Sequence, residues 1–233
     1  MKITHLKANK YTQRVSIFLD GDFAFSLHTQ TVLKNSLNVG KSLNTRLIKA
    51  LIIQSIKLEL YTLALAKIST RLHSQQEVSL YLNKVLRNKF IKISNPCIIP
   101  IYQEIKDNHR TLIDQTIKKL EKNNYLNDLK FAQNFASYNT DLSKKGPVYI
   151  KQQLIKKGVK LSIIDQVITD PNLFKKKNLN QNIKTLIIQN YQKIAYKHYP
   201  KIKLKKLLID RLIRRGYTYH QVVSQIDEFI SNK

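Results

Sequence analysis

The stretch Leu154–Val159 reads LIKKGV, and 58 residues later the stretch Leu212–Tyr217 reads LIRRGY. Each stretch ends an amphipathic run with two cations and a glycine, and a second apolar run follows each of them. Cations in the last turn of a helix interact favourably with the negative end of its dipole, and glycine takes the left-handed conformation that closes a helix. The two stretches therefore predict one helix–turn–helix unit that is used at least twice.

A third and weaker copy begins at Ser74–Glu77, which has the spacing of a helix capping box. When Leu82 is aligned with Leu154 and Leu212, the residue four positions earlier is apolar in every copy. These earlier residues are Val78, Ile150 and Leu208. Because internal repeats set the architecture of a chain, we predict three helical units whose apolar stripes face their cores.

The first part of the chain has a different pattern. Two strand-like runs, Arg14–Leu19 and Phe23–Leu27, are separated by Asp20-Gly21-Asp22, and Asp-Gly between two such runs indicates a β-hairpin. A hairpin alone is marginally stable in water, so we expect it to pair with the segment Ile3–Leu6 or to pack on the helices. From Thr45 to about Ser69 the apolar residues recur every three or four positions, which predicts a helix and ends the β region before residue 45.

The same signals divide the chain into four parts. We predict an N-terminal β-hairpin element at residues 1–44 and helical repeats at residues 45–126, 127–178 and 179–233. An insertion near 88–109 interrupts the first repeat as a loop or a short helical detour, because two prolines there disfavour a continuous helix. Asn127 is expected to cap the first helix of the second repeat, and Pro147 suits the first turn of its next helix.

The composition indicates a soluble, cytoplasmic protein, and we expect this protein to be a monomer. No stretch approaches the roughly 18 uninterrupted apolar residues of a membrane span, and the first residues lack the apolar block of a signal peptide. The single Cys97 agrees with a reducing compartment. With 42% hydrophobic residues and only 5 Gly and 5 Pro, the chain favours helices with short connections.

The formal net charge is +26, and it is densest late in the chain. Between Lys175 and Arg215 there are 13 cations and one acid, Asp210. Such a charge attracts polyanions and binds nucleic-acid phosphates in a salt-dependent manner. A second interpretation stays open, because only 8 of the 41 cations are arginine and the wealth of Lys, Ile and Asn is what an AT-rich genome produces.

No catalytic or metal-binding constellation stands out. The six histidines are scattered without the spacing of metal ligands, and neither a Walker A nor a dinucleotide-binding glycine motif is present. Asp20 and Asp22 are explained by the hairpin turn, and Asp128 by the start of a helix. We therefore predict a protein that is not an enzyme and that needs no cofactor and no metal.

The stretch Leu120–Ala132, LEKNNYLNDLKFA, belongs to a longer pattern. It is followed by Lys144–Pro147 and by the first glycine turn, and it is preceded by Arg71, Ser74 and Glu77. In order and spacing these residues resemble the bacterial recombination regulator RecX family, over about residues 60–230. The insertion near 88–109 and the many lysines depart from the family pattern.

The resemblance implies tandem three-helix repeats in an elongated, curved array, with the small N-terminal β-hairpin element that some members carry. It also implies a partner, because members of the family bind the RecA filament on single-stranded DNA and inhibit its ATP hydrolysis and strand exchange. Recombination, DNA repair and the SOS response are the processes concerned. The alternative from another class is a stand-alone basic helical nucleic-acid-binding protein, and an enzyme such as a nuclease ranks third.

The cations near the recurring turns are the candidate residues for binding nucleic acid or the filament, because equivalent turns in a repeat array would align along one edge. Solvated cations that complete helix C-termini remain the alternative for each of them. The candidates are Lys144, Lys145, Lys151, Lys156, Lys157, Arg211, Arg214 and Arg215.

Overall fold

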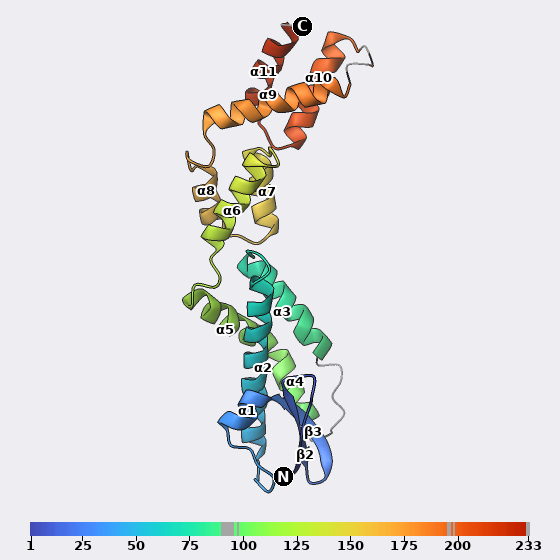
Figure 1. Cartoon of the computed structure of the whole chain (residues 1–233), viewed down its shortest axis with the longest axis vertical. Helices are drawn as coiled ribbons and strands as arrows, with labels where there is room; N and C mark the ends of the chain where they lie inside the picture. The colour runs from blue at the N-terminus through green and yellow to red at the C-terminus, as the bar shows by residue number, and fades with distance from the viewer. Residues whose placement is uncertain (90–95, 97, 195–196, 198, 232–233) are drawn as a thin grey trace. The chain divides into compact units, whose positions relative to one another are not determined.

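Figure 1 shows the computed structural model of the chain, which describes residues 1–89, 96, 98–194, 197 and 199–231. In this part of the chain three strands are followed by eleven helices, so the predicted mainly α fold with a small N-terminal β element is confirmed. The residues form two compact units. The first comprises Met1–His73 and Glu77–Leu126, and the second comprises Ser74–Gln76 and Asn127–Lys233. The division into three repeats stays a prediction.

The first unit opens with an antiparallel sheet in the order β1-β2-β3. Its strands are β1 (Ile3–Ala8), β2 (Arg14–Leu19) and β3 (Asp22–His28). Asp20 and Gly21 link β2 to β3 with φ angles of 49° and 100°, the successive positive values that a tight two-residue hairpin turn requires. Both the predicted hairpin and its pairing with the N-terminal segment are therefore confirmed.

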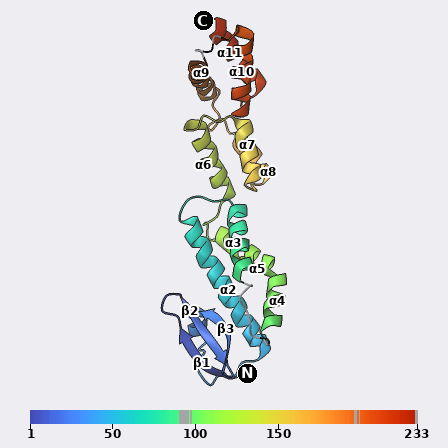
Figure 2. The ribbon, with the colours of Figure 1, turned by 90° about the vertical axis from the view of Figure 1, so that its right-hand side faces the viewer.

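One face of this sheet packs on the long helix α2 (Thr45–Ile68), as Figure 2 shows. The inward residues of β2 alternate along the strand and are buried. The backbone N–H of His28 donates to Ser55 Oγ at 2.7 Å, and Arg14 forms an ion pair with Glu59 at 2.6 Å. These contacts join the sheet to the helix. A sheet of this size is stable only when one face is covered, so the packing on α2 stabilises it.

Helix α2 begins and ends close to the predicted positions. The Oδ1 of Asn44 accepts a hydrogen bond from the Leu47 backbone N–H at 2.8 Å and so caps the first turn. The short helix α1 (Thr29–Lys34) precedes it and is capped by the His28 ring. At six residues, α1 is too short for hydrophobic periodicity to indicate it from the sequence.

Three further helices follow: α3 (Gln75–Lys89), α4 (Ile99–Asp107) and α5 (His109–Lys122). Most of the described part of the predicted insertion is helical. It contains α4, which has Pro100 in its first turn, and α5 begins two residues after α4 ends. Residues 90–95 and 97 of the insertion lie outside the described residues. Lys49 of α2 and Glu104 of α4 form an ion pair.

The second unit contains two sets of three helices, and each set surrounds its own apolar core. The predicted cap at Asn127 is confirmed, because its Oδ1 accepts from the Lys130 N–H at 2.9 Å, and Pro147 is the first residue of its helix as predicted. The first set is α6 (Asp128–Asp141), α7 (Pro147–Lys156) and α8 (Leu161–Ile168). The second set is α9 (Lys176–Gln192), α10 (Lys201–Arg214) and α11 (Tyr219–Ser231).

The residues that define the sequence repeat occupy equivalent places. Gly158 and Gly216 have φ angles of 72° and 92°, so both close their helices in the left-handed conformation as predicted. The six aligned apolar positions are all fully buried, at 0% exposure. They are Val78, Leu82, Ile150, Leu154, Leu208 and Leu212. The alignment of the three copies therefore identifies core positions correctly.

His73 is a buried histidine and the last residue of the segment Met1–His73 of the first unit. The residue is 3% exposed, its Nδ1 lies 2.8 Å from the Arg71 carbonyl oxygen, and its Nε2 has no partner among the described residues. Burial disfavours the charged ring and lowers the pKa of His73 below the ordinary value of 6.5.

This burial predicts that acid destabilises the protein. When the folded pKa of a histidine is lowered, the unfolded state binds more protons, so the stability contributed by neutral His73 is present above pH 6.5 and is lost as pH falls towards the folded pKa. Urea unfolding between pH 8 and pH 5 measures this loss. His73→Asn should flatten the decline below pH 6.5, and an unchanged decline in that variant would contradict the assignment.

Candidate nucleic-acid interface

The turn that contains Gly158 contacts Ser74–Gln76, the short segment at the start of α3 that belongs to the second unit. The hydroxyl of Ser74 donates to the carbonyl oxygen of Lys157 at 2.7 Å. A Cβ placed on Gly158 would lie 2.5 Å from the Cβ of Gln76, closer than real side chains approach. Glycine is thus required twice over at this position, for its positive φ and for this close approach.

The turn that contains Gly216 is docked in the same way. The backbone N–H of Gly146 donates to the Arg215 carbonyl at 2.9 Å, and that of Val148 donates to the Gly216 carbonyl at 3.1 Å. A Cβ on Gly146 would lie 2.2 Å from the Gly216 oxygen, and a Cβ on Gly216 would lie 2.3 Å from the Tyr149 nitrogen. Two backbone segments are therefore in direct contact here.

The two contacts occupy equivalent positions of the repeat, and we call each of them a glycine junction. In the alignment of the copies, Ser74 corresponds to Gly146 and Lys157 corresponds to Arg215. In both, the residue before a helix donates to the carbonyl of the residue before the turn glycine. The sequence pattern indicates the turns but not the helix starts that they contact. Each junction fixes the backbone that carries the two consecutive cations before its turn glycine.

The second junction brings three of the candidate cations together. The Nη1 of Arg215 donates to the Ser143 carbonyl at 2.9 Å, and Lys145 Nζ lies 4.3 Å from the centre of the Tyr149 ring. Burial, and then the neighbouring charge of Arg215, lower the pKa of Lys145. With Lys144 these two residues form what we call the junction cluster. No ion pair to any of its three members is found in the described part of the chain.

Tyr217 holds the backbone of this cluster and is missing from the sequence-based candidates. Its hydroxyl donates to the carbonyl oxygen of Lys144 at 3.1 Å, and Lys144 has a left-handed φ of 49°. Burial raises the pKa of Tyr217 to about 12, so the hydroxyl keeps its proton at every physiological pH. Tyr217 and Lys144 are 73 residues apart, and no local pattern in the sequence indicates this hydrogen bond.

Three other candidates are engaged by neighbouring side chains. Lys151 forms an ion pair with Asp165 at 2.8 Å. Lys157 Nζ lies over the rings of two phenylalanines of α6, at 5.6 Å from the closer ring centre, and Arg211 donates to Asn190 Oδ1 at 3.3 Å. Their charges are thus partly used inside the unit, which leaves them less free to bind an anion.

The last two candidates are the most accessible. Lys156 and Arg214 are exposed, and each is the last residue of its helix, α7 or α10. The Nε of Arg214 donates to the Asp210 carbonyl within its own helix at 3.2 Å, which leaves its two terminal nitrogens to donate elsewhere. Together with the junction cluster, these residues are the cations best placed to bind phosphate.

Two kinds of feature are absent from the described residues. Among them, no group of three or more His, Cys, Asp or Glu side chains is arranged to hold a metal ion. None of the described helices is both long and apolar enough to cross a membrane.

Two family profiles match the chain. The profile described as the regulatory protein RecX N-terminal domain matches residues 1–44, and the profile described as the RecX second three-helix domain matches residues 127–168. The first match covers the sheet and α1, and the second covers the set α6 to α8.

Curated relatives match along nearly the whole chain. A protein named Regulatory protein RecX from Clostridium acetobutylicum is 24% identical over 230 residues, which cover 98% of this chain and 96% of the relative. A protein of the same name from Listeria monocytogenes is 28% identical over 221 residues, which cover 94% of this chain and 72% of the relative.

Solved structures share the fold. A crystal structure of regulatory protein RecX covers 100% of this chain and 99% of its own, with a TM-score of 0.66 and 19% identity. The crystal structure of RecX from Lactobacillus salivarius covers 74% of this chain and 96% of its own, with a TM-score of 0.57 and 22% identity.

The junction geometry predicts a graded cost for three alanine substitutions. Gly21→Ala meets no atom within 4 Å and should cost about 1 kcal/mol of stability through its positive φ alone. Gly146→Ala meets the Gly216 backbone and should cost about 3 kcal/mol, because backbone cannot move aside as a flexible side chain does. Gly216→Ala combines both effects and should cost about 4 kcal/mol.

Urea unfolding followed by circular dichroism measures the three costs, with Gly21→Ala as the control for backbone strain without a steric clash. The order of the costs matters more than their absolute size. If Gly146→Ala unfolded at the same urea concentration as Gly21→Ala, the second junction would not be the close backbone contact described above.

Proposed function

Because the chain belongs to the RecX family, we propose that it is a regulator that binds the RecA filament on single-stranded DNA and inhibits its ATPase and strand-exchange activities. It would thereby modulate recombination, DNA repair and the SOS response in the cytoplasm. Relatives named Regulatory protein RecX that align with nearly the whole chain support this proposal. Their name fits a protein that acts by binding.

The single observation that carries the proposal beyond the family name is the repeated glycine junction. A filament presents the same surface at regular intervals, and a partner built from repeats can present matching groups at regular intervals too. In both copies the junction fixes a turn that carries two cations, Lys156 and Lys157 in one and Arg214 and Arg215 in the other. We propose that such turns follow the phosphates of the filament's DNA.

Within this proposal the candidate cations have different roles. Lys156, Arg214 and the junction cluster bind phosphate, because no carboxylate among the described residues pairs with them. Lys151, Lys157 and Arg211 chiefly hold the helices through the contacts described above. Arg215 does both, since one of its nitrogens donates to Ser143 and the others remain available.

A stand-alone basic nucleic-acid-binding protein is the second candidate function, and the net charge of +26 favours it. The two candidates differ in whether the recombinase is needed. A regulator of the filament binds single-stranded DNA more tightly once RecA coats it. A stand-alone DNA binder competes with RecA for the same strand and binds bare DNA at least as well.

The decisive experiment is ATP hydrolysis by the cognate RecA on single-stranded DNA. We expect substoichiometric amounts of the protein to slow hydrolysis and strand exchange, because one regulator bound to a filament affects many RecA subunits. Unchanged rates at equimolar protein would exclude the regulatory role. Slowing that appears only at saturating protein, and that more single-stranded DNA relieves, would favour the stand-alone DNA binder.

A second prediction separates the proposed phosphate-binding cations from those that are already paired. Lys144→Gln, Lys156→Gln and Arg214→Gln together should weaken binding to DNA and to the filament. The slope of log affinity against log salt should fall by roughly one unit for each phosphate that the variant no longer binds. The measurement is fluorescence anisotropy of a labelled oligonucleotide at several salt concentrations.

The matched control removes the same amount of charge from the same unit. Lys151→Gln, Lys184→Gln and Lys205→Gln each remove a lysine that is paired with a carboxylate, of Asp165, Glu228 and Asp227 respectively. This variant should keep a salt slope close to that of the wild type. An equal decrease of the slope in the two triple variants would show that net charge, and not the glycine-junction turns, determines binding.

A further inference from the structure

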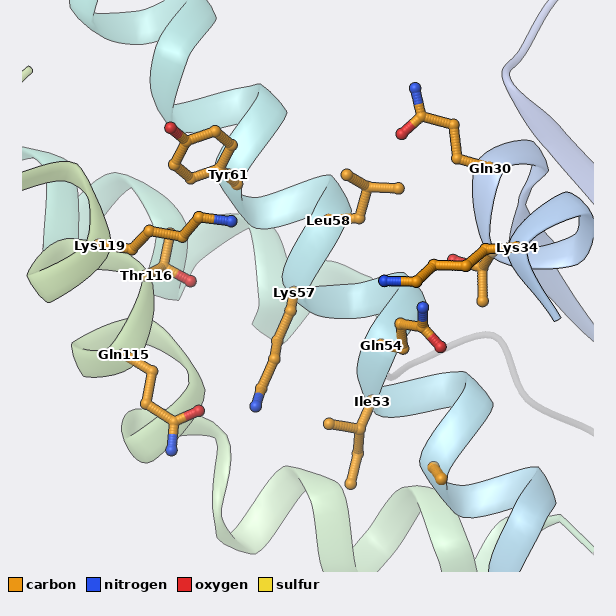
Figure 3. Close-up of a pocket in the computed structure, with 12 residues that line it drawn as sticks. Gln30, Lys34, Ile53, Gln54, Lys57, Leu58, Tyr61, Gln115, Thr116 and Lys119 are labelled. Carbon is orange, nitrogen blue, oxygen red and sulfur yellow. The ribbon is translucent and has the colours of Figure 1, made fainter. Parts of the chain in front are cut away.

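The first unit contains a groove of about 770 Å³ between α1, α2 and α5. Figure 3 shows its lining side chains, which come from all three helices. Its volume lies within the range of about 300–1,000 Å³ that is typical of small-molecule sites. None of the cations proposed to bind the filament belongs to it.

Three lysines give this groove its charge. Lys34 of α1 and Lys119 of α5 extend towards α2 from opposite sides, and Lys57 projects from α2 itself (Figure 3). All three are exposed, and no ion pair to any of them is found in the described part of the chain. No Asp or Glu lines the groove. Three cations without a carboxylate create a site that is suited to an anion.

The wall of the groove is held in place by side-chain contacts. The Nδ2 of Asn35 donates to Gln54 Oε1 at 3.1 Å, which leaves both amide hydrogens of Gln54 able to donate to a ligand. The hydroxyl of Tyr61 accepts from Asn123 at 2.9 Å, and Lys119 Nζ lies 4.5 Å from the centre of the Tyr61 ring. These contacts position an amide and an aromatic ring beside the cations before any ligand binds.

The remaining lining residues are apolar or amide-bearing. Ala50, Ile53 and Leu58 of α2 provide apolar surface, and Gln30 and Gln115 provide further amides. Thr31 also lines the groove at 1% exposure, and its Oγ1 has no hydrogen-bond partner among the described residues. A buried hydroxyl without a partner calls for an explanation, and a ligand or an ordered water would provide one.

We propose that this groove binds a nucleotide, with its phosphate at the lysines and its base against the apolar and amide groups of α2. A bare inorganic anion would use the lysines but neither the apolar surface nor the amides. A nucleotide uses all three, because it combines a charged phosphate, a planar apolar face and a polar base edge. The nucleotide is either free or one unit of a single strand, since both present the same chemistry.

This site lies entirely within the first unit, whereas the cations of the glycine junctions lie in the second. The two proposals therefore rest on different residues, and one can fail while the other holds. An experiment on the full chain distinguishes the two proposals if it measures each lysine separately.

Acylation of lysines with a small reagent, read by mass spectrometry, gives this resolution. The full chain is labelled alone, with ATP, with a twelve-residue oligothymidylate and with inorganic phosphate. We expect Lys34, Lys57 and Lys119 to be protected by ATP or by the oligonucleotide, whereas Lys7, Lys84 and Lys106, exposed lysines of the same unit that do not line the groove, keep their reactivity. Protection by ATP identifies a free nucleotide, and protection by the oligonucleotide alone identifies a strand.

Two results would overturn the proposal. One is the absence of protection of the three groove lysines by either ligand. The other is equal protection by inorganic phosphate, which would show a surface that attracts anions without recognising a nucleotide. Equal protection of Lys7, Lys84 and Lys106 would have the same meaning, because they sample the general charge of the unit.

A single substitution tests the groove without removing the lysines that report on it. Ala50 is exposed on α2 and lines the groove, so Ala50→Glu places a carboxylate there while keeping a strong helix former. The new carboxylate repels the phosphate of the ligand, so we expect at least about tenfold weaker protection, which corresponds to about 1.4 kcal/mol. Ala50→Gln has the same size without the charge and should retain most of the protection. Equal loss in both variants, or no loss in Ala50→Glu, would contradict the site.

Discussion

The glycine junction is the contact on which the arrangement of the second unit depends. At each junction a helix start reaches the carbonyl before a turn glycine, through Ser74 Oγ in one copy and through the Gly146 N–H in the other. Backbone atoms come so close at the second junction that no side chain larger than hydrogen fits on Gly146. Such a contact fixes the position of the turn, because backbone atoms cannot move aside as the end of a flexible side chain does.

The junctions also explain why cations near the turns are not equivalent. A helix C-terminus favours Lys and Arg for electrostatic reasons, so the presence of cations there does not by itself indicate a binding site. The structure distinguishes them by their partners. Lys151 is paired with a carboxylate and Lys157 lies over aromatic rings, whereas Lys156 and Arg214 remain exposed. An unpaired cation can bind phosphate without first giving up a carboxylate partner, which makes it the better candidate.

The two units use their positive charge in different settings. In the second unit the proposed phosphate-binding cations lie at the C-termini of α7 and α10 and in the connection between α6 and α7. In the first unit three lysines surround a groove that also contains apolar and amide groups. Charge that recurs at successive turns suits a long polyanion, and charge in a groove suits a ligand that is partly enclosed. A net charge of +26 alone indicates neither arrangement.

Features that depend on neighbours along the chain can be predicted from the sequence. Hairpin, helix starts and closing glycines follow from local φ preferences, capping and periodicity, so Asp20-Gly21, Asn127 and Gly158 were predicted correctly. Features that depend on distant residues become visible in the folded chain alone. Gly146 has an ordinary φ of −81°, so its sequence context suggests no more than a break between helices, and the need for glycine arises from Gly216, 70 residues away. The Tyr217 hydrogen bond and the groove lined by α1, α2 and α5 likewise join segments that no local pattern connects, because side-chain contacts across a fold follow from packing and not from spacing in the sequence.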